Sequence, residues 1–281
     1  MNQVPENSDT SSSGSPKNTS TTPAGAAPAA VTPNLPPVDG LRAWGVCFGV
    51  FCAGFVSLGW TYAQGIFVIP LQQEFDASLT QISLIATMNF VFFFAGGVLS
   101  GPLSAKYGVK RLIVFGSAMW VTGMFLGSAS HTAWESILTQ GVMTGIGSSA
   151  LYWPSLAVTP TWFNKYRATA MGAAVLGSSI GLLAMSLGGQ QLLQSFGWRT
   201  TLQIFGGVGA GLLLVAIALI DRRTPPLRSQ GLFTVTWVLL KLPSFQLFIT
   251  AVFFFQFCFF IPYLYIAPVG CLYLVSIWRS N

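Results

Sequence analysis

Long apolar runs, separated by short polar segments, make up most of the chain after its first forty or so residues. Each run is almost free of charge, and together they extend over about 43–69, 79–103, 112–130, 137–159, 168–193, 201–220 and 245–266. A helix needs roughly 20 apolar residues to cross the ~30 Å hydrocarbon core of a bilayer. The pattern therefore predicts an all-α integral membrane protein with several spanning helices.

Positive charge is distributed unevenly over the segments between these runs. A basic segment at 101–112 joins the second and third runs, whereas an acidic segment at 74–76 follows the first run without a Lys or Arg. Because cytoplasmic loops collect Lys and Arg, we expect the basic segment inside and the acidic one outside. All Lys and Arg except Arg199 and Arg279 then fall on the inner side. The protein is expected to be multi-pass with a cytoplasmic amino terminus, in the plasma membrane.

Composition narrows the function classes. Only 7% of the residues are charged and 52% are hydrophobic, whereas soluble domains have roughly 25% charged residues. The net charge of +6 is spread over short loops, so we interpret it as setting the orientation of the helices in the membrane and not as a nucleic-acid-binding surface. His131 lies in a loop, and no carboxylate pair or activated nucleophile is visible, so an enzyme is not expected. The cysteines form no CxxC motif, which favours packing over a disulfide or metal site, and no cofactor is expected.

Composition also divides the chain into expected parts. Residues 1–38 are rich in Ser, Thr, Pro and Ala, with too few large apolar side chains to offset the entropy of folding, and are expected to form a disordered cytoplasmic tail. Six helices within 39–221 would form one bundle. A cytoplasmic linker at 222–242 would follow, and then a seventh helix with the truncated start of a second bundle at 243–281.

Polar groups inside the runs are few and uncharged. No Asp, Glu, Lys, Arg or His lies in the interior of a run, and such residues usually mark proton relays and ion sites. This part of the protein is therefore expected to supply no titratable group for coupling. Asn89 lies near the middle of the second run, where an unpaired amide facing lipid is costly. It either bonds a neighbouring helix or faces a water-filled cavity, and the sequence favours neither.

Small residues recur at helical spacing in the fourth and fifth runs. One stripe extends over 141–152 and ends at Tyr152, and another covers 172–181 and includes Ser178. Such stripes favour close helix packing, with Tyr152 the strongest candidate for a cavity. The serine hydroxyls could bond either the backbone or a substrate.

The basic segment carries a spaced set of small and basic residues. The set comprises Gly101, Leu103, Ser104, Lys106, Gly108, Lys110 and Arg111. It resembles the signature loop of the major facilitator superfamily, which joins the second and third helices. A merely positive loop that orients the helices is the alternative interpretation. The family uses an acidic residue of this loop to latch the two halves of the transporter together. Ala105 replaces that residue, so any latch is expected to be weakened or absent.

Two further motifs stand before the first helix and at the start of the fifth. Their residues are Asp39, Gly40, Trp44, Trp162, Phe163, Lys165, Arg167, Gly172 and Gly177. They resemble the signatures of the monocarboxylate transporter family in its fungal-type branch, although Arg42 stands where an aromatic or small residue is commoner. Animal members of that family use a lysine in the first helix and an Asp-Arg pair in the eighth to handle the proton and the carboxylate. Gln64 lies near the place of that lysine, so proton-linked monocarboxylate transport is not carried over.

The resemblance implies a twelve-helix fold of two halves, each built from inverted three-helix repeats, that works by alternating access. We therefore expect a secondary transporter of a small organic solute, such as a monocarboxylate, embedded in the lipid bilayer. Its cavity would be lined by polar residues of the first, second, fourth and fifth helices, namely Gln64, Asn89, Tyr152 and Ser178. The alternative is a truncated, non-transporting fragment or membrane scaffold that needs a partner half, for example through self-association.

Overall fold

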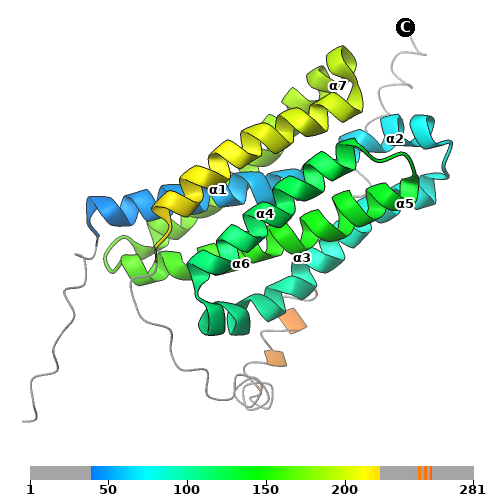
Figure 1. Cartoon of the computed structure of the whole chain (residues 1–281). Coiled ribbons are helices and arrows are strands. Elements are labelled where there is room, and N and C mark those ends of the chain that lie inside the picture. The colour runs from blue at the N-terminus through cyan, green and yellow to red at the C-terminus, as the bar shows by residue number, and fades with distance from the viewer. Residues whose placement is uncertain (1–38, 222–242, 244–245, 248–249, 252–253, 255–281) are drawn as a thin grey trace, which may run out of the picture. The chain divides into compact units, whose positions relative to one another are not determined.

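The computed structural model describes residues 39–221, together with 243, 246–247, 250–251 and 254 (Figure 1). The predicted tail at 1–38 and the predicted linker at 222–242 lie outside the described residues. So does most of the predicted seventh helix, whose few described residues are helical. No strand occurs in the described part of the chain, and the predicted all-α fold is confirmed.

Nine helical elements follow one another from Leu41 to Leu219 within the described residues. They are α1 (Leu41–Ala63), η1 (Gln64–Phe67), α2 (Val68–Phe75), α3 (Leu79–Tyr107), α4 (Val109–Ser128), α5 (Ala133–Ser136), η2 (Ile137–Met143), α6 (Thr144–Trp162) and α7 (Arg167–Leu219). By length and composition, segments able to cross a membrane are Leu41–Phe75, Leu79–Tyr107, Val109–Ser128 and Arg167–Leu219.

The longest helix, α7, is two helices joined at a sharp break. It contains 53 residues, about 80 Å at 1.5 Å per residue, which is far more than a bilayer core requires. Gly197 interrupts it with φ 76° and ψ 170°, a conformation that glycine adopts without steric cost. Figure 1 shows α7 as two segments that fold back on each other. The fifth and sixth apolar runs therefore correspond to the two segments of α7.

The helix formed by the first apolar run extends further than the sequence predicted. We expected the helix to end with the apolar run at residue 69, just before Pro70, yet α2 continues through Phe75 and has Asp76, whose φ is 46°, as its C-cap. Pro70 lies in the first turn of α2, where a backbone N–H needs no intrahelical partner. A proline at this position therefore does not stop the helix, and the prediction of its end was wrong.

The basic segment is also more helical than predicted. We expected a turn over 101–112, but α3 continues through Pro102 to Tyr107 and α4 begins at Val109. Only Gly108, with φ 89°, separates the two helices. Proline is tolerated in membrane helices where side chains and neighbouring helices satisfy the freed backbone groups. The turn thus consists of one glycine.

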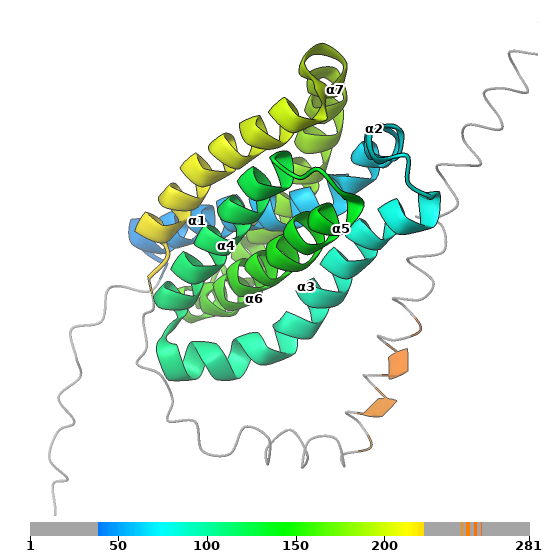
Figure 2. The same cartoon turned by 45° about the vertical axis from the view of Figure 1, so that its right-hand side comes forward.

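Helix α1 runs beside α7 (Figure 2). The contact between these two helices is more extensive than that between any other two described elements. The approach is close because glycines face backbone across the contact. A Cβ atom on Gly177 or Gly181 would overlap the carbonyl oxygen of Phe51 or Phe55, respectively, and one on Gly59 would lie 2.8 Å from the carbonyl carbon of Gly181. The small-residue stripe of the fifth run is therefore a packing surface.

The same kind of contact joins α6 to both α3 and α4. A Cβ atom on Gly145 would lie 2.9 Å from the carbonyl oxygen of Asn89 in α3, and one on Gly116 of α4 would lie 2.8 Å from that of Gly147. Without a hydrophobic driving force between helices in lipid, such close backbone contact supplies much of the attraction. The glycines of η2 and α6 therefore hold three helices together.

The segment before α1 binds the loop between α6 and α7. The carboxylate of Asp39 accepts hydrogen bonds from the backbone N–H groups of Asn164 and Lys165, both at 3.2 Å. Its own N–H donates to the carbonyl of Trp162 at 3.1 Å. Desolvation raises the pKa of Asp39, but the N–H donors of Lys165, Asn164 and Tyr166 outweigh it and hold that pKa below its ordinary value. Residues more than 120 positions apart are thus joined by charge-assisted bonds.

Further contacts at this end connect α1 to the end of α7. Arg42 pairs with Asp221 at 3.2 Å, and the indole N–H of Trp162 donates to the Asp221 carbonyl at 2.9 Å. The rings of Trp44 and Phe163 meet edge to face at 5.2 Å. We name Asp39, Arg42, Trp44, Trp162, Phe163 and Asp221 the clasp. Arg42, which departs from the family pattern, supplies its ion pair.

The opposite end of the bundle has a smaller tie of its own. Arg199, just after the break in α7, pairs with Glu74 of α2 at 3.3 Å. The rings of Phe75 and Trp198 lie 5.7 Å apart beside this pair. Both side chains of the ion pair are partly exposed, so its contribution to stability is small.

Replacing Gly177 with alanine should destabilise the bundle by about 1–3 kcal/mol, since the added methyl group overlaps the α1 backbone. Thermal unfolding of the detergent-solubilised chain measures this. Gly172→Ala is the matched control, because a Cβ atom there has no neighbour within 4 Å. Equal melting temperatures for the two variants would contradict the close α1–α7 contact.

The stabilisation from Asp39 should depend on pH. Its pKa is lowered in the folded protein, so its contribution is complete above about pH 4 and is lost as the pH falls through the folded-state pKa. We expect Asp39→Asn to lower the melting temperature at neutral pH, with a difference from the unmodified chain that shrinks on acidification. Asp76→Asn removes the same charge at the opposite end, and an identical pH profile for both variants would argue against the clasp.

Candidate functional site

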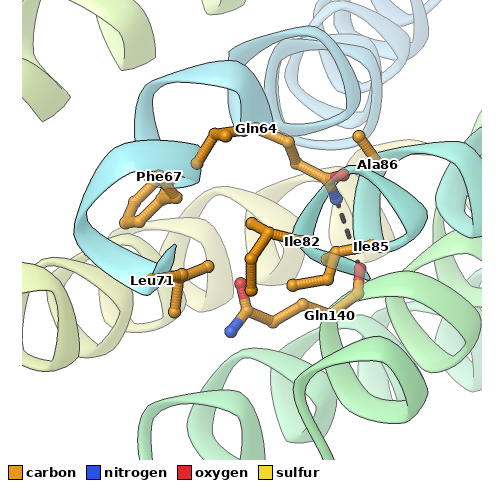
Figure 3. Close-up of a pocket in the computed structure, with 8 residues that line it drawn as sticks. Gln64, Phe67, Leu71, Ile82, Ile85, Ala86 and Gln140 are labelled. Carbon is orange, nitrogen blue, oxygen red and sulfur yellow. Dashed lines mark hydrogen bonds between the residues drawn. The ribbon is translucent and has the colours of Figure 1, made fainter. Parts of the chain in front are cut away.

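Polar side chains from three parts of the bundle converge on one carbonyl oxygen, that of Gln140 in η2. Gln64 donates to it from Nε2 at 3.2 Å, as the dashed line in Figure 3 shows. Asn89 of α3 donates from Nδ2 to the same carbonyl at 3.4 Å and to the hydroxyl of Thr144 at 2.8 Å. The Thr144 hydroxyl in turn donates to the Gln140 carbonyl. We name Gln64, Asn89, Gln140 and Thr144 the polar hub.

Local backbone geometry brings the hub together. Gln140 lies in a π-helical stretch, and such stretches depart from the usual i to i−4 hydrogen-bond ladder and are frequent at functional sites. Thr144 begins α6 four residues later, which places its side chain on the same helix face as Gln140. Gln64 begins η1, where α1 changes to a tighter 3₁₀ turn. Irregular helix thus surrounds the hub on two sides.

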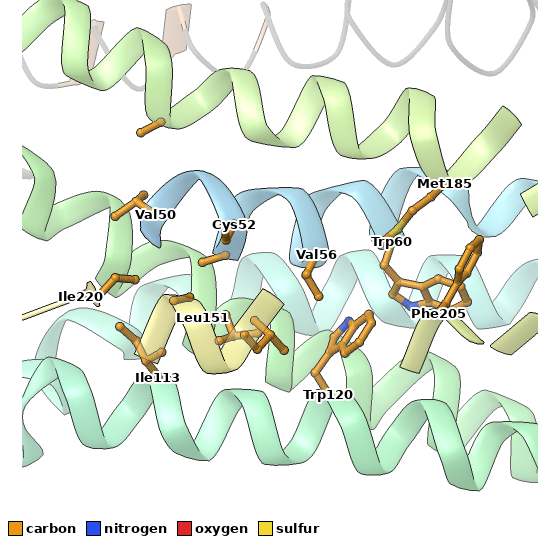
Figure 4. Packing of buried hydrophobic residues seen from close by; sticks show 14 of the residues in the cluster. Val50, Cys52, Val56, Trp60, Ile113, Trp120, Leu151, Met185, Phe205 and Ile220 are labelled. Atoms are coloured by element: carbon orange, nitrogen blue, oxygen red, sulfur yellow. The ribbon is translucent and has the colours of Figure 1, made fainter. Parts of the chain in front are cut away.

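A large aromatic cluster supports the hub from the side of α1 and α7. The indole N–H of Trp60 donates to the Thr144 hydroxyl at 3.3 Å. The Trp60 ring packs 5.5 Å from Phe67 and 6.5 Å from Phe205 of α7. Figure 4 shows Trp60 beside Phe205 and Met185 in the core. Because Trp60 is fully buried, the Thr144 hydroxyl is held in place by rigid packing.

Several polar atoms of the hub have no hydrogen-bond partner. They are Oε1 of Gln64, Oδ1 of Asn89 and Nε2 of Gln140, and all three residues are at least 95% buried. An unpartnered buried group costs about 1–3 kcal/mol. A cavity of about 10 Å³ lies between Gln64 and Gln140 and is otherwise apolar, with Phe67 among the residues that line it. This is about the space of one water molecule. The hub can therefore accept and donate further hydrogen bonds without carrying charge.

Tyr152 and Ser178 lie apart from the hub, and both approach Gly54 of α1. A Cβ atom on Gly54 would lie 3.7 Å from Cε2 of Tyr152 and 3.6 Å from the backbone nitrogen of Ser178. The Ser178 hydroxyl donates to the Val175 carbonyl of its own helix at 2.6 Å. The Tyr152 ring is 5.9 Å from that of Phe93. Of the two roles that the sequence left open for the Ser178 hydroxyl, the structure shows the backbone bond.

The predicted lining residues are thus brought together as two pairs. Gln64 and Asn89 meet at the hub, while Tyr152 and Ser178 both lie near Gly54. The Asn89 side chain bonds a neighbouring helix through its Nδ2, whereas its Oδ1 has no hydrogen-bond partner. Sequence reasoning did not single out Gln140 and Thr144. The sequence feature that could have indicated them is the presence of two polar residues four positions apart in an apolar run.

A second aromatic cluster lies where α3 and α6 meet. Trp153 packs 5.6 Å from Phe93 and 6.3 Å from Phe94, and its indole N–H donates to the Phe93 carbonyl at 3.2 Å. Tyr62 of α1 adds a ring 5.8 Å from Phe90. Phe93 is buried and Phe94 is 39% exposed, so the cluster joins the two helices and reaches the surface at Phe94.

The signature loop lies at the clasp end of the bundle and is exposed. Lys106, Lys110 and Arg111 form no ion pair with the residues that the structure describes, and the ammonium of Lys106 is 5.2 Å from the Tyr107 ring. A latch to a second half would involve residues outside the described ones. Across 39–221 and the other described positions, no cluster of His, Cys, Asp and Glu could hold a metal ion.

Comparison with known proteins places these features in a family. Residues 49–275 match the Major Facilitator Superfamily. The chain is 32% identical over 197 residues to MFS-type transporter 1 of Ophiocordyceps sp., covering 69% of this chain and 44% of that protein. It is 30% identical over 244 residues to the fujikurins efflux protein of Gibberella fujikuroi, covering 84% and 51% respectively. It is 31% identical over 207 residues to monocarboxylate transporter 2 of Mesocricetus auratus, covering 72% and 42%.

The chain spans about half the length of the curated relatives that it matches. The family match covers most of this chain, including all helices from α2 to α7, and agrees with the signature loop and with the all-helical, apolar fold. The chain therefore belongs to the Major Facilitator Superfamily.

Proposed function

We propose that the chain forms one half of the pathway of a secondary transporter for a small organic solute, similar to the monocarboxylate transporters. Transport would occur by alternating access between this six-helix bundle, residues 39–221, and a second bundle that begins at 243–281. The polar hub is the observation that carries this proposal. It gathers hydrogen-bonding groups from three helices inside an otherwise apolar bundle.

The hub suits recognition of a solute because it has spare capacity. The unpartnered oxygens of Gln64 and Asn89 can accept hydrogen bonds, and the unpartnered nitrogen of Gln140 can donate one. Solute hydroxyl, amide or carbonyl groups would recover the free energy that burial of these atoms costs. The hub contains no charged group, so this half would recognise a solute through neutral hydrogen bonds. A carboxylate would need its counter-charge from another part of the transporter.

We propose a cytoplasmic location for the clasp end and for the amino terminus. Lys106, Lys110 and Arg111 lie at the junction of α3 and α4, at the same end of the bundle as Arg42 and Lys165. The opposite end carries Glu74, Asp76 and Glu135, with Arg199 as its cation. This asymmetry follows the positive-inside rule. The plasma membrane is the proposed location.

A second candidate function follows from the coverage of the relatives. This chain corresponds to 44% of one relative and 51% of another, whereas the pathway of the family lies between two halves. The chain would then be a non-transporting fragment or membrane scaffold that needs a partner half. A second copy of the chain is one such partner.

Uptake of labelled small carboxylates and of neutral organic solutes separates the two candidates. Cells or vesicles expressing the 281-residue chain would be assayed with surface abundance measured in parallel. Saturable accumulation supports transport by this chain and implies that copies pair to form a pathway. Insertion without uptake would overturn transport by the chain alone and favour the fragment or scaffold.

Asn89→Leu should lower uptake by roughly 3- to 15-fold without lowering surface abundance, because it removes the unpartnered amide oxygen that would bond the solute, and one hydrogen bond between buried groups in a membrane protein contributes about 0.6–1.7 kcal/mol. The assay is performed on this chain, or at the aligned position of a full-length relative if the chain alone has no uptake. Thr87→Val is the matched control, since Thr87 is exposed on the same helix and bonds only within it. An Asn89→Leu variant with uptake equal to the control removes Asn89 from the site.

A further inference from the structure

An apolar crevice of about 300 Å³ lies between α3 and α4, with α6 as its floor. The two helices diverge from Gly108 and each packs far more extensively on α6 than on the other. The walls of the crevice include Leu99 and Leu103 of α3 and Leu112 and Phe115 of α4. Leu99 and Phe115 are more than half exposed, so within a bilayer core the crevice would be open to lipid and not to water. It therefore suits a flexible hydrocarbon chain.

We propose that this crevice binds an anionic phospholipid, with an acyl chain between α3 and α4 and the headgroup at Lys106 and Arg111. The proposal depends on the proposed orientation of the bundle, which places this end at the anionic cytoplasmic leaflet. It does not depend on which solute the transporter carries. Failure of the uptake assay and failure of lipid binding are therefore separate results.

Helix geometry places the two cations at the mouth of the crevice. Lys106 follows Leu103 by three residues in α3, and Arg111 precedes Phe115 by four residues in α4, so each shares a helix face with a crevice residue. Both cations are exposed and form no ion pair with a described residue. Ala105 stands beside Lys106, so the acidic residue of the family pattern is missing here.

Lys110 carries the same charge but faces another way. It precedes Phe115 by five residues and Leu112 by two, which turns it away from the crevice-lining face of α4. A merely positive loop would use all three cations alike. An occupant of the crevice would use Lys106 and Arg111 in preference to Lys110.

The charge pattern favours a phospholipid over a neutral apolar solute. A neutral solute would fill the crevice without using the cations at its mouth. An anionic headgroup gains from each nearby Lys or Arg, by roughly fivefold in affinity per cation. An acyl chain attached to that headgroup lies parallel to the helices, along the same direction as the crevice. Long basic side chains can reach the headgroup while their stems cover apolar surface.

The headgroup part is tested by native mass spectrometry of the purified 281-residue chain with equal amounts of phosphatidylserine and phosphatidylcholine. We expect phosphatidylserine to be retained preferentially. Lys106→Gln and Arg111→Gln should each lower that preference by about fivefold. Lys110→Gln is the matched control and should retain most of it. Equal retention of the two lipids, or an equal loss with Lys110→Gln, would overturn the proposal.

The crevice part is tested by filling the space. Ala95 lines the crevice and is exposed, so Ala95→Phe should fill it without disturbing the core, and should lower retention of both lipids. Leu99→Trp is a second filling variant in case the first does not fold, since Leu99 is 55% exposed. Ala184→Phe, on an exposed face of α7, is the control. Unchanged retention in a folded filling variant would show that lipid binds only at the surface charges and not in the crevice.

Discussion

The close approach of α1 to α7 is the contact on which the rest of the bundle depends. In lipid, helices gain little from burying apolar side chains against each other, so attraction must come from short-range packing and hydrogen bonds. Gly177 and Gly181 allow the carbonyls of Phe51 and Phe55 to touch the facing helix. A larger side chain at either position would separate the helices and weaken every contact along α1.

This contact fixes where the polar groups of α1 lie. With α1 held against α7, Trp60 reaches Thr144 and Gln64 reaches Gln140 on the other side of the helix. The hub is thus assembled by packing elsewhere in the bundle, and its own hydrogen bonds then fix the position of η2. Polar groups left without partners persist because the surrounding packing is rigid.

The apolar runs predicted within 43–220 are helical in the structure, although the helix of the fourth run is not among the segments long and apolar enough to cross a membrane. The prediction failed at Pro70 and Pro102, because the effect of proline depends on its position in a helix and on neighbouring groups. Asp39 and the 162–165 segment were recognised only as parts of two separate sequence motifs. Their contact is a tertiary one across more than 120 residues, and no local pattern reports such a pairing. The convergence at Gln140 was missed because the π-helical register has no signal in the apolar pattern.

The clasp has a consequence for connectivity. Asp39 and Asp221, the first and last residues of the described bundle, both bond Trp162, so the bundle begins and ends at the same place. A unit with adjacent ends can be joined to another copy of itself, or circularly permuted, without rearranging its helices. Two such units could be fused head to tail on one membrane face through a modest linker. The ion pair of Arg42 with Asp221 would then lie directly beside the junction between the two units.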